Sequence, residues 1–275
     1  MRLTLLGTGC PKVDHKRFGP ANLISTKKTN ILVDCGSGVT QRLEKAGVSS
    51  ANVSALFLTH LHSDHVIDLY QLIISSWHSY RTKPWLIFGP KGTKRFVKNI
   101  MEAWKEERTQ RIKYEKRSSI KAFEIKVKEF GDYGKFKIKD LLIEYFEVDH
   151  KPVKYAYGFN FYNKKRKLSI SGDTRPCENL LKYTQLSDVL LHEVFIEGEI
   201  MKSHKMRSKK TLHNVKNYHT PSTLVGKVAK ITRCKKLVLT HFVPTKFDEK
   251  KLIKTVKKDF NKKLIIGRDL LKITI

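Results

Sequence analysis

The stretch FLTHLHSDH, residues 57–65, constrains the fold of this chain more than any other feature of its sequence. An apolar run ends at His60, and His62, Asp64 and His65 follow directly. Polar side chains gathered at the end of a buried strand need partners, because an unpaired polar group is costly to bury. Imidazole nitrogens and carboxylate oxygens bind zinc, and also manganese or iron. The stretch therefore predicts a metal site at the end of a strand.

Three more residues with ligand-type side chains follow apolar segments later in the chain. The segment FEVDH ends in His150, SISGD ends in Asp173 and LVLTH ends in His241. Each residue stands just past an apolar strand, so we expect all three to project from one rim of the sheets. Together with the residues at 60–65 they make seven candidate metal ligands.

The positions of these seven residues suggest two metal ions. The first two histidines of the motif point the same way on an extended turn, whereas its last two residues begin the next helix and face a neighbouring point. The expected sets are His60, His62 and His150 for one ion and Asp64, His65 and His241 for the other, with Asp173 bridging them. Ions bridged in this way lie about 3.5–4 Å apart and can supply hydroxide near neutral pH, because the metal lowers the pKa of a bound water to about 7.

The apolar pattern of the whole chain predicts interleaved strands and helices. Short apolar runs predict strands over 2–9, 30–36, 54–60, 85–90, 141–150, 155–163, 167–173, 188–195 and 236–242. Helical spacing predicts helices over 39–47, 64–80, 91–108, 175–185 with Pro176 in its first turn, and 220–233 capped by Thr220. The lysine-rich segment 199–218 is expected to be a mobile loop or a short helix. Strands in both halves favour two sheets covered by helices, in one domain over residues 1–275.

The order of these motifs resembles the metallo-β-lactamase superfamily of binuclear hydrolases. The segments GTG, VDCG, FLTHLHSDH, SGDTRPCENL, HEVF, YHT and LVLTHF are most similar to its ribonuclease Z branch, the tRNA 3′-processing endonucleases and their phosphodiesterase relatives. The resemblance implies an α/β fold, a four-layer αββα sandwich of two mixed β-sheets flanked by helices. It implies two divalent metal ions, zinc first and manganese or iron as alternatives. The family's metal ligands match His60, His62, Asp64, His65, His150, Asp173 and His241.

The resemblance also assigns catalytic roles, to Asp64, Glu193 and His219. Glu193 in HEVF and His219 in YHT match the family's paired carboxylate and histidine near the leaving group. If they pair, the carboxylate would orient the ring and raise its pKa, which would make His219 a general acid near neutral pH. The alternative is that His219 only caps the helix after it. His192, inside an apolar strand, is expected to be structural. Asp68 stands where many relatives have glycine. It is interpreted either as a charge on the helix surface or as a residue that reshapes the substrate entrance.

One feature of ribonuclease Z enzymes is absent from the sequence. Their long tRNA-gripping arm lies between the third ligand histidine and the bridging aspartate, where this chain has only residues 151–172, which read as two strands and a turn. The opening GTGCPKVDHKRFGPANLI also looks more like small-substrate members of the branch. We therefore expect a phosphodiesterase acting by metal-bound hydroxide on an RNA 3′ end or a small phosphodiester. The alternatives are a hydrolase of a lactone, aryl sulfate or phosphotriester, and a nucleic-acid-binding protein without activity.

Composition adds information about partners and location. With 55 Lys and Arg against 26 Asp and Glu, the net charge is +29, which fits either an anionic partner such as RNA or a general lysine bias. The four cysteines are dispersed without a C-x-x-C pair, as is typical of reduced thiols in a cytoplasm. No apolar run reaches the ~18 residues of a membrane helix, and the N-terminus lacks a signal-peptide core. The sequence thus predicts a cytoplasmic protein with an anionic substrate and no membrane partner, and it allows a homodimer.

Overall fold

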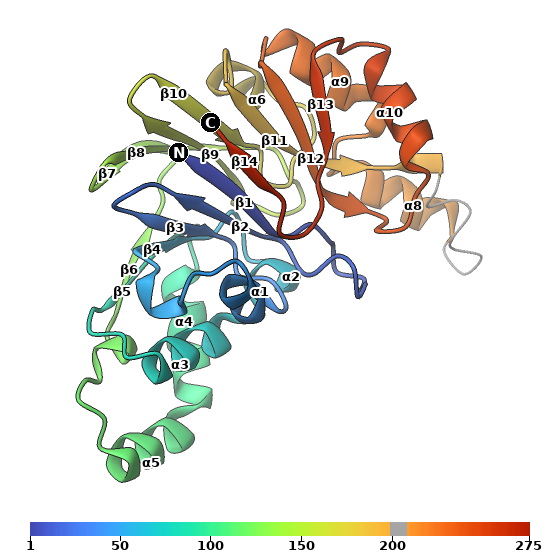
Figure 1. Cartoon of the computed structure of the whole chain (residues 1–275). Coiled ribbons are helices and arrows are strands. Elements are labelled where there is room, and N and C mark those ends of the chain that lie inside the picture. Colours follow the sequence, from blue (N-terminus) through green and yellow to red (C-terminus); the bar gives the residue numbers. More distant parts are fainter. Residues whose placement is uncertain (199–207) are drawn as a thin grey trace.

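Two β-sheets form the centre of the molecule in the computed structural model, which describes residues 1–198 and 208–275 (Figure 1). Within these residues each sheet has seven strands. The first sheet has the order β14 (Lys272–Thr274), β1 (Arg2–Gly7), β2 (Ala21–Ser25), β3 (Asn30–Val33), β4 (Ala55–Phe57), β5 (Trp85–Gly89) and β6 (Ile125–Glu129). The second has the order β13 (Lys263–Ile266), β12 (Lys236–Val243), β11 (Val189–Phe195), β10 (Arg166–Ile170), β9 (Tyr157–Asn163), β8 (Leu141–Glu147) and β7 (Tyr133–Ile138).

Both sheets are mixed, as the family resemblance implied. In the first sheet β1, β2 and β3 pair antiparallel, and β3 to β6 run parallel. In the second sheet β7 to β10 pair antiparallel, and β10 to β13 run parallel. Strands β4 and β11 are buried along their whole length. Burial on both faces is what parallel strands require, and it explains why these segments are continuously apolar in the sequence.

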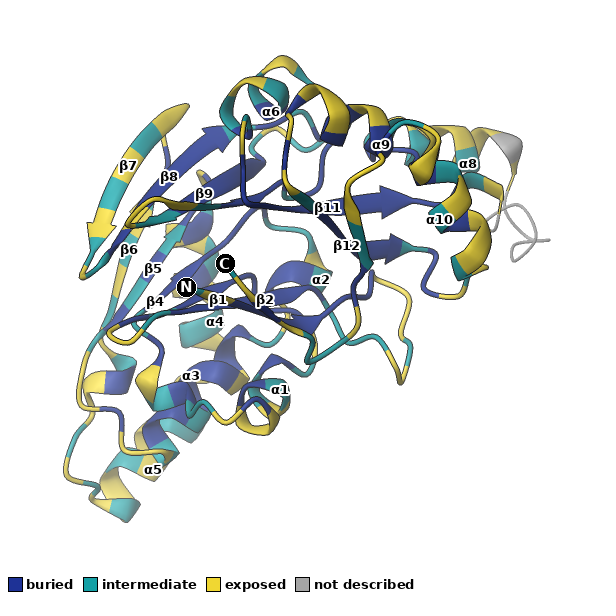
Figure 2. Ribbon diagram, turned by 45° about the horizontal axis from the view of Figure 1, so that its top comes forward, coloured by how far each residue is buried: buried dark blue, intermediate teal, exposed yellow. Residues whose placement is uncertain are grey.

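The strands of both sheets are largely buried where the sheets face each other (Figure 2). The main core lies between the two sheets, and aromatic side chains from both contribute to it. Phe57 of β4 stacks on Phe88 of β5 with 4.5 Å between ring centroids, and it meets the edge of Phe159 of β9 at 5.7 Å. Two further apolar clusters cover the outer faces of the sheets, one beneath helices of the N-terminal half and one beneath helices of the C-terminal half. The molecule therefore has the four layers expected of an αββα sandwich.

Helices cover the two outer faces. The N-terminal half supplies α1 (Val39–Lys45), η1 (Ser50–Asn52), α2 (Ser63–Val66), α3 (Leu69–His78), α4 (Thr93–Ala103), α5 (Lys105–Glu115) and η2 (Lys121–Phe123). The C-terminal half supplies α6 (Glu178–Tyr183), α8 (Lys209–Lys216), α9 (Ser222–Ile231) and α10 (Glu249–Lys257). Among the described residues, none of these helices is long and apolar enough to cross a membrane. Residues 199–207 of the predicted lysine-rich segment lie outside the described residues, and part of its remainder forms α8.

Four helix predictions differ from the structure. The helix expected over 64–80 is interrupted after α2, and the Asp68 carboxylate there accepts a 2.6 Å hydrogen bond from the backbone N–H of Gly38. Pro176 precedes α6 instead of lying in its first turn, because the helix begins only at Glu178. Thr220 does not cap α9; its hydroxyl donates to the carbonyl oxygen of Thr174 at 2.6 Å. The helix expected over 91–108 is likewise two helices.

Candidate metal centre and active site

The seven predicted ligands converge where the strand ends of the two sheets meet. His60 and His62 lie in the turn after β4, and Asp64 and His65 lie in α2. The other three follow or end strands of the second sheet: His150 after β8, Asp173 after β10 and His241 near the end of β12. All of them except His62 and Asp64 are buried. The fold thus brings four neighbours in sequence together with three distant residues.

The distances between ligand atoms separate two groups. Nε2 of His150 lies 3.4 Å from Nδ1 of His62, and His60 completes this group. Nε2 of His241 lies 3.3 Å from Oδ2 of Asp64, and His65 completes the second group. In each group the ligand atoms lie within 4.8 Å of one another, close enough to share one cation. These are the two groups that the sequence predicted.

Asp173 lies between the two groups. Its Oδ2 is 3.9 Å from Nε2 of His60 in the first group, and 3.4 and 3.2 Å from Nε2 of His65 and His241 in the second. The surrounding histidines outweigh the effect of burial and hold the pKa of Asp173 well below its usual value. A carboxylate that stays ionised between two groups of imidazoles has the position that a bridging ligand needs.

A further set of hydrogen bonds fixes which ring nitrogen faces the centre. Nδ1 of His65 lies 2.8 Å from the carboxylate of Asp34, and Nδ1 of His150 lies 2.7 Å from the carbonyl oxygen of Tyr218. Nδ1 of His60 lies 3.0 Å from the hydroxyl of Thr59, which itself donates to Asp34. Each Nδ1 therefore carries the proton, and each Nε2 lone pair faces the cluster. Asp34 and Thr59 were not predicted as site residues, although VDCG and FLTH contain them.

The donor set fits divalent cations. Nε2 of His60 and of His65 are buried and have no hydrogen-bond partner among the described residues, which is costly unless a cation takes their lone pairs. Burial lowers the pKa of His60 well below its usual value and that of His150 to about 4, so both rings are neutral near pH 7, as ligands must be. Burial also opposes a charge on His65, but three carboxylates outweigh it and raise its pKa. The cluster therefore favours positive charge at its centre.

Glu193 and His219 pair beside this cluster. Nδ1 of His219 lies 3.0 Å from both carboxylate oxygens of Glu193, and Glu193 also accepts the backbone N–H groups of Thr174 and Thr220 at 2.9 and 3.2 Å. The ring centroid of His219 is 5.6 Å from that of His241. The predicted pairing is present, but the predicted rise in pKa is wrong for the free chain. Burial lowers the pKa of His219 to about 4 and raises that of Glu193 well above its usual value, because it disfavours both charges.

Two residues singled out in the sequence lie outside the cluster. His192 is fully buried in β11, and its Nδ1 lies 2.7 Å from the carbonyl oxygen of Glu193. The Asp68 carboxylate accepts a hydrogen bond from the backbone at the start of α1. It therefore links the start of α1 to the segment between α2 and α3. Its contact is structural.

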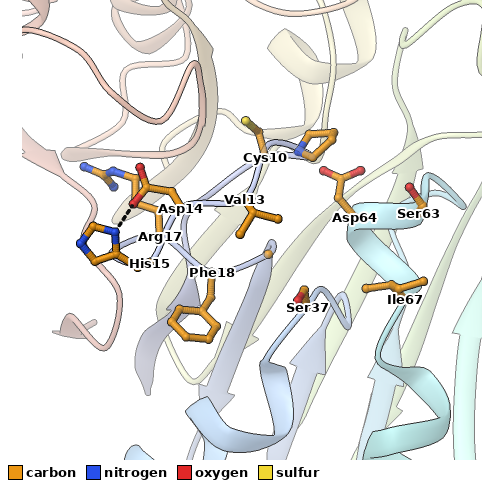
Figure 3. Close-up of a pocket in the computed structure, with 12 residues that line it drawn as sticks. Cys10, Val13, Asp14, His15, Arg17, Phe18, Ser37, Ser63, Asp64 and Ile67 are labelled. Carbon is orange, nitrogen blue, oxygen red and sulfur yellow. Dashed lines mark ion pairs between the residues drawn. The ribbon is translucent and has the colours of Figure 1, made fainter.

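A pocket of about 390 Å³ opens beside Asp64 (Figure 3). The loop from Cys10 to Gly19 forms one side, and Ser63, Asp64 and Ile67 at α2 form the other. The base of this loop is fixed by Asp269, which accepts hydrogen bonds from the backbone N–H groups of Thr8 and Phe18 at 3.0 and 2.8 Å. The pocket thus has a firmly held wall next to the candidate metal centre.

The fold and the clustered histidines and aspartates define a metallo-β-lactamase-fold hydrolase. A family model described as "Anti-Pycsar protein Apyc1" matches residues 1–220. A curated protein named ribonuclease Z from Mycolicibacterium gilvum (strain PYR-GCK) is 31% identical over 282 residues, covering 100% of this chain and 96% of that protein. The chain therefore belongs to the Apyc1 family of ribonuclease Z-like proteins, and it is a metal-dependent phosphodiesterase related to ribonuclease Z, as its motifs predicted.

Solved structures show the same fold. The metallo-β-lactamase fold protein YhfI from Bacillus subtilis superposes with a TM-score of 0.76 at 18% identity, over 99% of this chain and 98% of that one. Human tRNase Z, short form, superposes with a TM-score of 0.74 at 23% identity, over 100% and 99% of the two chains. At these identities the likeness concerns the fold, and it confirms the two-sheet architecture expected from the sequence.

Proposed function

We propose that this chain hydrolyses phosphodiesters with two divalent cations, zinc in the first instance, bound at the two ligand groups that share Asp173. The observation that carries the proposal is the position of Asp173, whose Oδ2 lies within 3.9 Å of Nε2 atoms from both groups. Cations held there would activate a water and polarise the phosphoryl oxygens. The first ion would take His60, His62 and His150, and the second Asp64, His65 and His241.

The residues around the cations would orient the substrate and deliver a proton. In the reaction a water oxygen forms a bond to phosphorus, the bond to one ester oxygen breaks, and that oxygen takes up a proton. Nδ1 of His219 is held by Glu193, so Nε2 is the nitrogen free to face the departing oxygen. An anionic diester brings negative charge close to this ring and raises its pKa above the free-chain value. We assign His219 the proton delivery, Glu193 its orientation, and Asp64 a place beside the reacting phosphoryl group.

The substrate that we propose is a small phosphodiester in preference to a precursor tRNA. Residues 151–172, between His150 and Asp173, contain only the short strand pair β9 and β10, joined across Lys164 and Lys165. This leaves no protruding arm at the place where the sequence resemblance puts one. The curated relatives are named ribonuclease Z, so an RNA 3′ end is the competing substrate of the same reaction.

Metal analysis and a substrate panel test the proposal together. Purified, unchelated protein should contain two transition-metal ions per chain and should hydrolyse bis(p-nitrophenyl) phosphate, with activity lost on chelation and restored by zinc. A lactone and an aryl sulfate test hydrolysis of other esters, and an unprocessed tRNA tests cleavage of RNA. Protein without metal, or with turnover only of the lactone or sulfate, would refute the proposal. Efficient 3′ cleavage of the tRNA would refute the preference for a small diester.

Salt dependence separates the two readings of the net charge of +29. An RNA-binding surface would lose affinity steeply as salt rises, because phosphate contacts release counterions. We expect weak RNA binding near physiological salt and nearly salt-independent turnover of a small diester. We also propose that the chain forms a single domain. A cytoplasmic location is the second proposal, and the four free cysteines among the described residues are in line with it. We also propose that the chain can form a homodimer, which a measurement of its molar mass in solution by light scattering should test.

A further inference from the structure

We propose that the pocket beside Asp64 binds the ester group that stays on phosphorus, and that it selects a flat, largely apolar group there. The inference rests on the proposed phosphodiesterase function and adds the class of substrate. The pocket lies next to the candidate metal centre, since Asp64 and Ser63 form part of its wall. Neither His219, Glu193 nor His150 lines it. The group that departs beside His219 is therefore not the group that occupies this pocket.

The walls of the pocket favour an apolar occupant. Val13 is 91% exposed and Ile67 is 58% exposed, and they stand on opposite sides of the hollow (Figure 3). Ser37 lies between them in this view, and Phe18 also lines the pocket. Exposed aliphatic side chains facing each other lose water contact when an apolar group enters, and this favours binding by about 25 cal/mol per Å² of apolar surface removed from water.

The size and polarity of the pocket narrow the occupant further. A volume of about 390 Å³ lies at the small end of ligand pockets, about 300–1,000 Å³, and suits one or two fused rings instead of a folded polynucleotide. The hydroxyls of Ser37 and Ser63 and the ring of His15 can bond polar edges of such a ring. Nη1 of Arg17 donates to the hydroxyl of Thr8 and to the carbonyl oxygen of Gly267, which holds this side chain at the base of the loop. An aryl group or a nucleobase on the retained ester arm fits these walls.

The loop that carries Val13 is fixed at its base, so the pocket is a persistent feature. Asp269 holds the backbone of Thr8 and Phe18, and it forms an ion pair with Arg42 at 3.2 Å. The guanidinium of Arg17 also lies 4.2 Å from the ring centroid of Phe242. Preformed walls reduce the entropy lost on binding and so favour discrimination between substrates.

Two substrates with one leaving group test the inference. Bis(p-nitrophenyl) phosphate and methyl p-nitrophenyl phosphate both release p-nitrophenolate, but they retain an aryl and a methyl group respectively. The wild-type chain should prefer the aryl substrate in kcat/KM. Ile67→Ala should reduce the aryl-to-methyl ratio about tenfold, the lower end for loss of an apolar contact in a pocket. Ser37→Phe, which fills the floor, should reduce the ratio as well.

The control is Ile231→Ala on α9, because Ile231 has a similar exposure of 53% and lies outside the pocket. It should leave both kinetic constants unchanged. Metal content and melting temperature of each variant show whether the centre is intact. If both substrates are hydrolysed but neither pocket variant changes the ratio, the inference is wrong while the proposed function stands. If neither substrate is hydrolysed by the wild-type, metal-loaded chain, the proposed function fails.

A second inference comes from an independent observation, the ring of His241. Its Nδ1 is buried and has no partner among the described residues, unlike Nδ1 of His60, His65 and His150. Asn22 Oδ1 is buried without a partner as well, and both residues line the same cavity of about 20 Å³. That volume holds one water molecule. We infer that a water accepts from Nδ1–H of His241 and donates to Asn22, which makes Asn22 a positioning residue for the second metal ion.

Metal affinity tests this role without relying on activity. Asn22→Leu removes the acceptor and fills the cavity, and it should weaken the second ion about 10–100-fold in a chelator competition, as is usual when such an outer contact is lost. Asn22→Asp keeps an acceptor oxygen and should retain the affinity. The melting temperature of the chelated chains reports any folding defect separately. Equal metal affinities for Asn22→Leu and wild type would exclude the role.

Discussion

The two halves of the molecule supply their ligands in different ways. The N-terminal sheet contributes four candidate ligands from one continuous stretch, 60–65, directly after β4. The C-terminal sheet contributes three, and each comes from the end of a different strand, β8, β10 or β12. The first set is visible as a motif in a short piece of sequence. The second becomes a site only when the strands pair, so it depends on the tertiary fold.

The hydrogen-bond partners that orient the ligand histidines also differ between the two halves. In the N-terminal half the carboxylate of Asp34 bonds His65 and Thr59, and Thr59 in turn bonds His60. In the C-terminal half His150 relies on the backbone carbonyl oxygen of Tyr218. A side-chain support can be removed by one substitution, whereas a backbone support cannot. The halves should therefore respond differently to mutation.

The largest expected contrast is between Asp173→Ala and His62→Ala. Asp173 lies between the two ligand groups as the proposed bridge, so its loss should take the metal content from two ions to none, whereas His62→Ala should empty one site. Each emptied site costs the folded chain about 2.7 kcal/mol at a free metal concentration 100 times Kd. Metal analysis and calorimetry with and without metal measure both effects. Two retained ions in Asp173→Ala would contradict the bridging position.

His219→Ala comes next in size and probes chemistry at the C-terminal half. General acid catalysis contributes about 10²–10⁴-fold, and it matters most for poor leaving groups. Turnover of an alkyl phosphodiester should fall by that factor, while bis(p-nitrophenyl) phosphate should be much less affected. Metal analysis must show unchanged ion content. Equal losses on both substrates would favour a positional role for His219 over proton delivery.

Asp34→Asn tests the support of the N-terminal ligands. The amide cannot accept the Nδ1–H of His65 as strongly, so metal affinity should fall about 10–100-fold in chelator titrations. Asp188→Asn is the matched control, because this carboxylate bonds Lys167 and Lys235 outside the cluster. Its metal affinity should equal that of the wild type. If the two variants behave alike, the Asp34 contact does not tune the metal site.

The smallest effect concerns pH and a histidine that the metal centre does not use. Burial lowers the pKa of His192 to about 4 from an unfolded value near 6.5. The unfolded chain then binds the extra proton, so this contribution to stability is present above pH 6.5 and is lost as pH falls towards 4, by about 3 kcal/mol. Denaturant unfolding of chelated protein should show His192→Leu losing less stability than wild type over this range. Parallel pH profiles would contradict the assignment.

The sequence was sufficient to predict the strands that are buried on both faces, because these segments are continuously apolar. It missed β6 and β7, which read IKVKE and YGKFKI, because lysines alternate with the inward-facing residues. It also missed β2 and the lysine-rich helix α10. The break at Asp68 was not visible, since the carboxylate acts on Gly38, which is distant in sequence.

The sequence allowed prediction of which residues form the candidate site, but only part of the electrostatics of that site. Histidine and aspartate at strand ends identified seven residues that the fold brings together, and His219 lies in the same cluster, close to Asp173 and His241. The pKa of His219 was predicted in the wrong direction, because burial depends on tertiary packing that one residue's neighbours in sequence do not reveal. The roles of Asp34 and Thr59 were missed for a related reason, since the bonds between them form only when β3 and β4 pair.

The contacts of Asp269 also set an order of events during synthesis. The loop that walls the pocket begins at Thr8, but the carboxylate that holds it is 261 residues further along the chain. Strand β14, which pairs with β1, comes later still. A ribosome therefore releases the N-terminal loop long before its anchor exists, although domains generally fold from the N-terminus during translation. The entrance to the site is among the last parts of the molecule to become ordered, so an unfinished chain has no closed substrate wall.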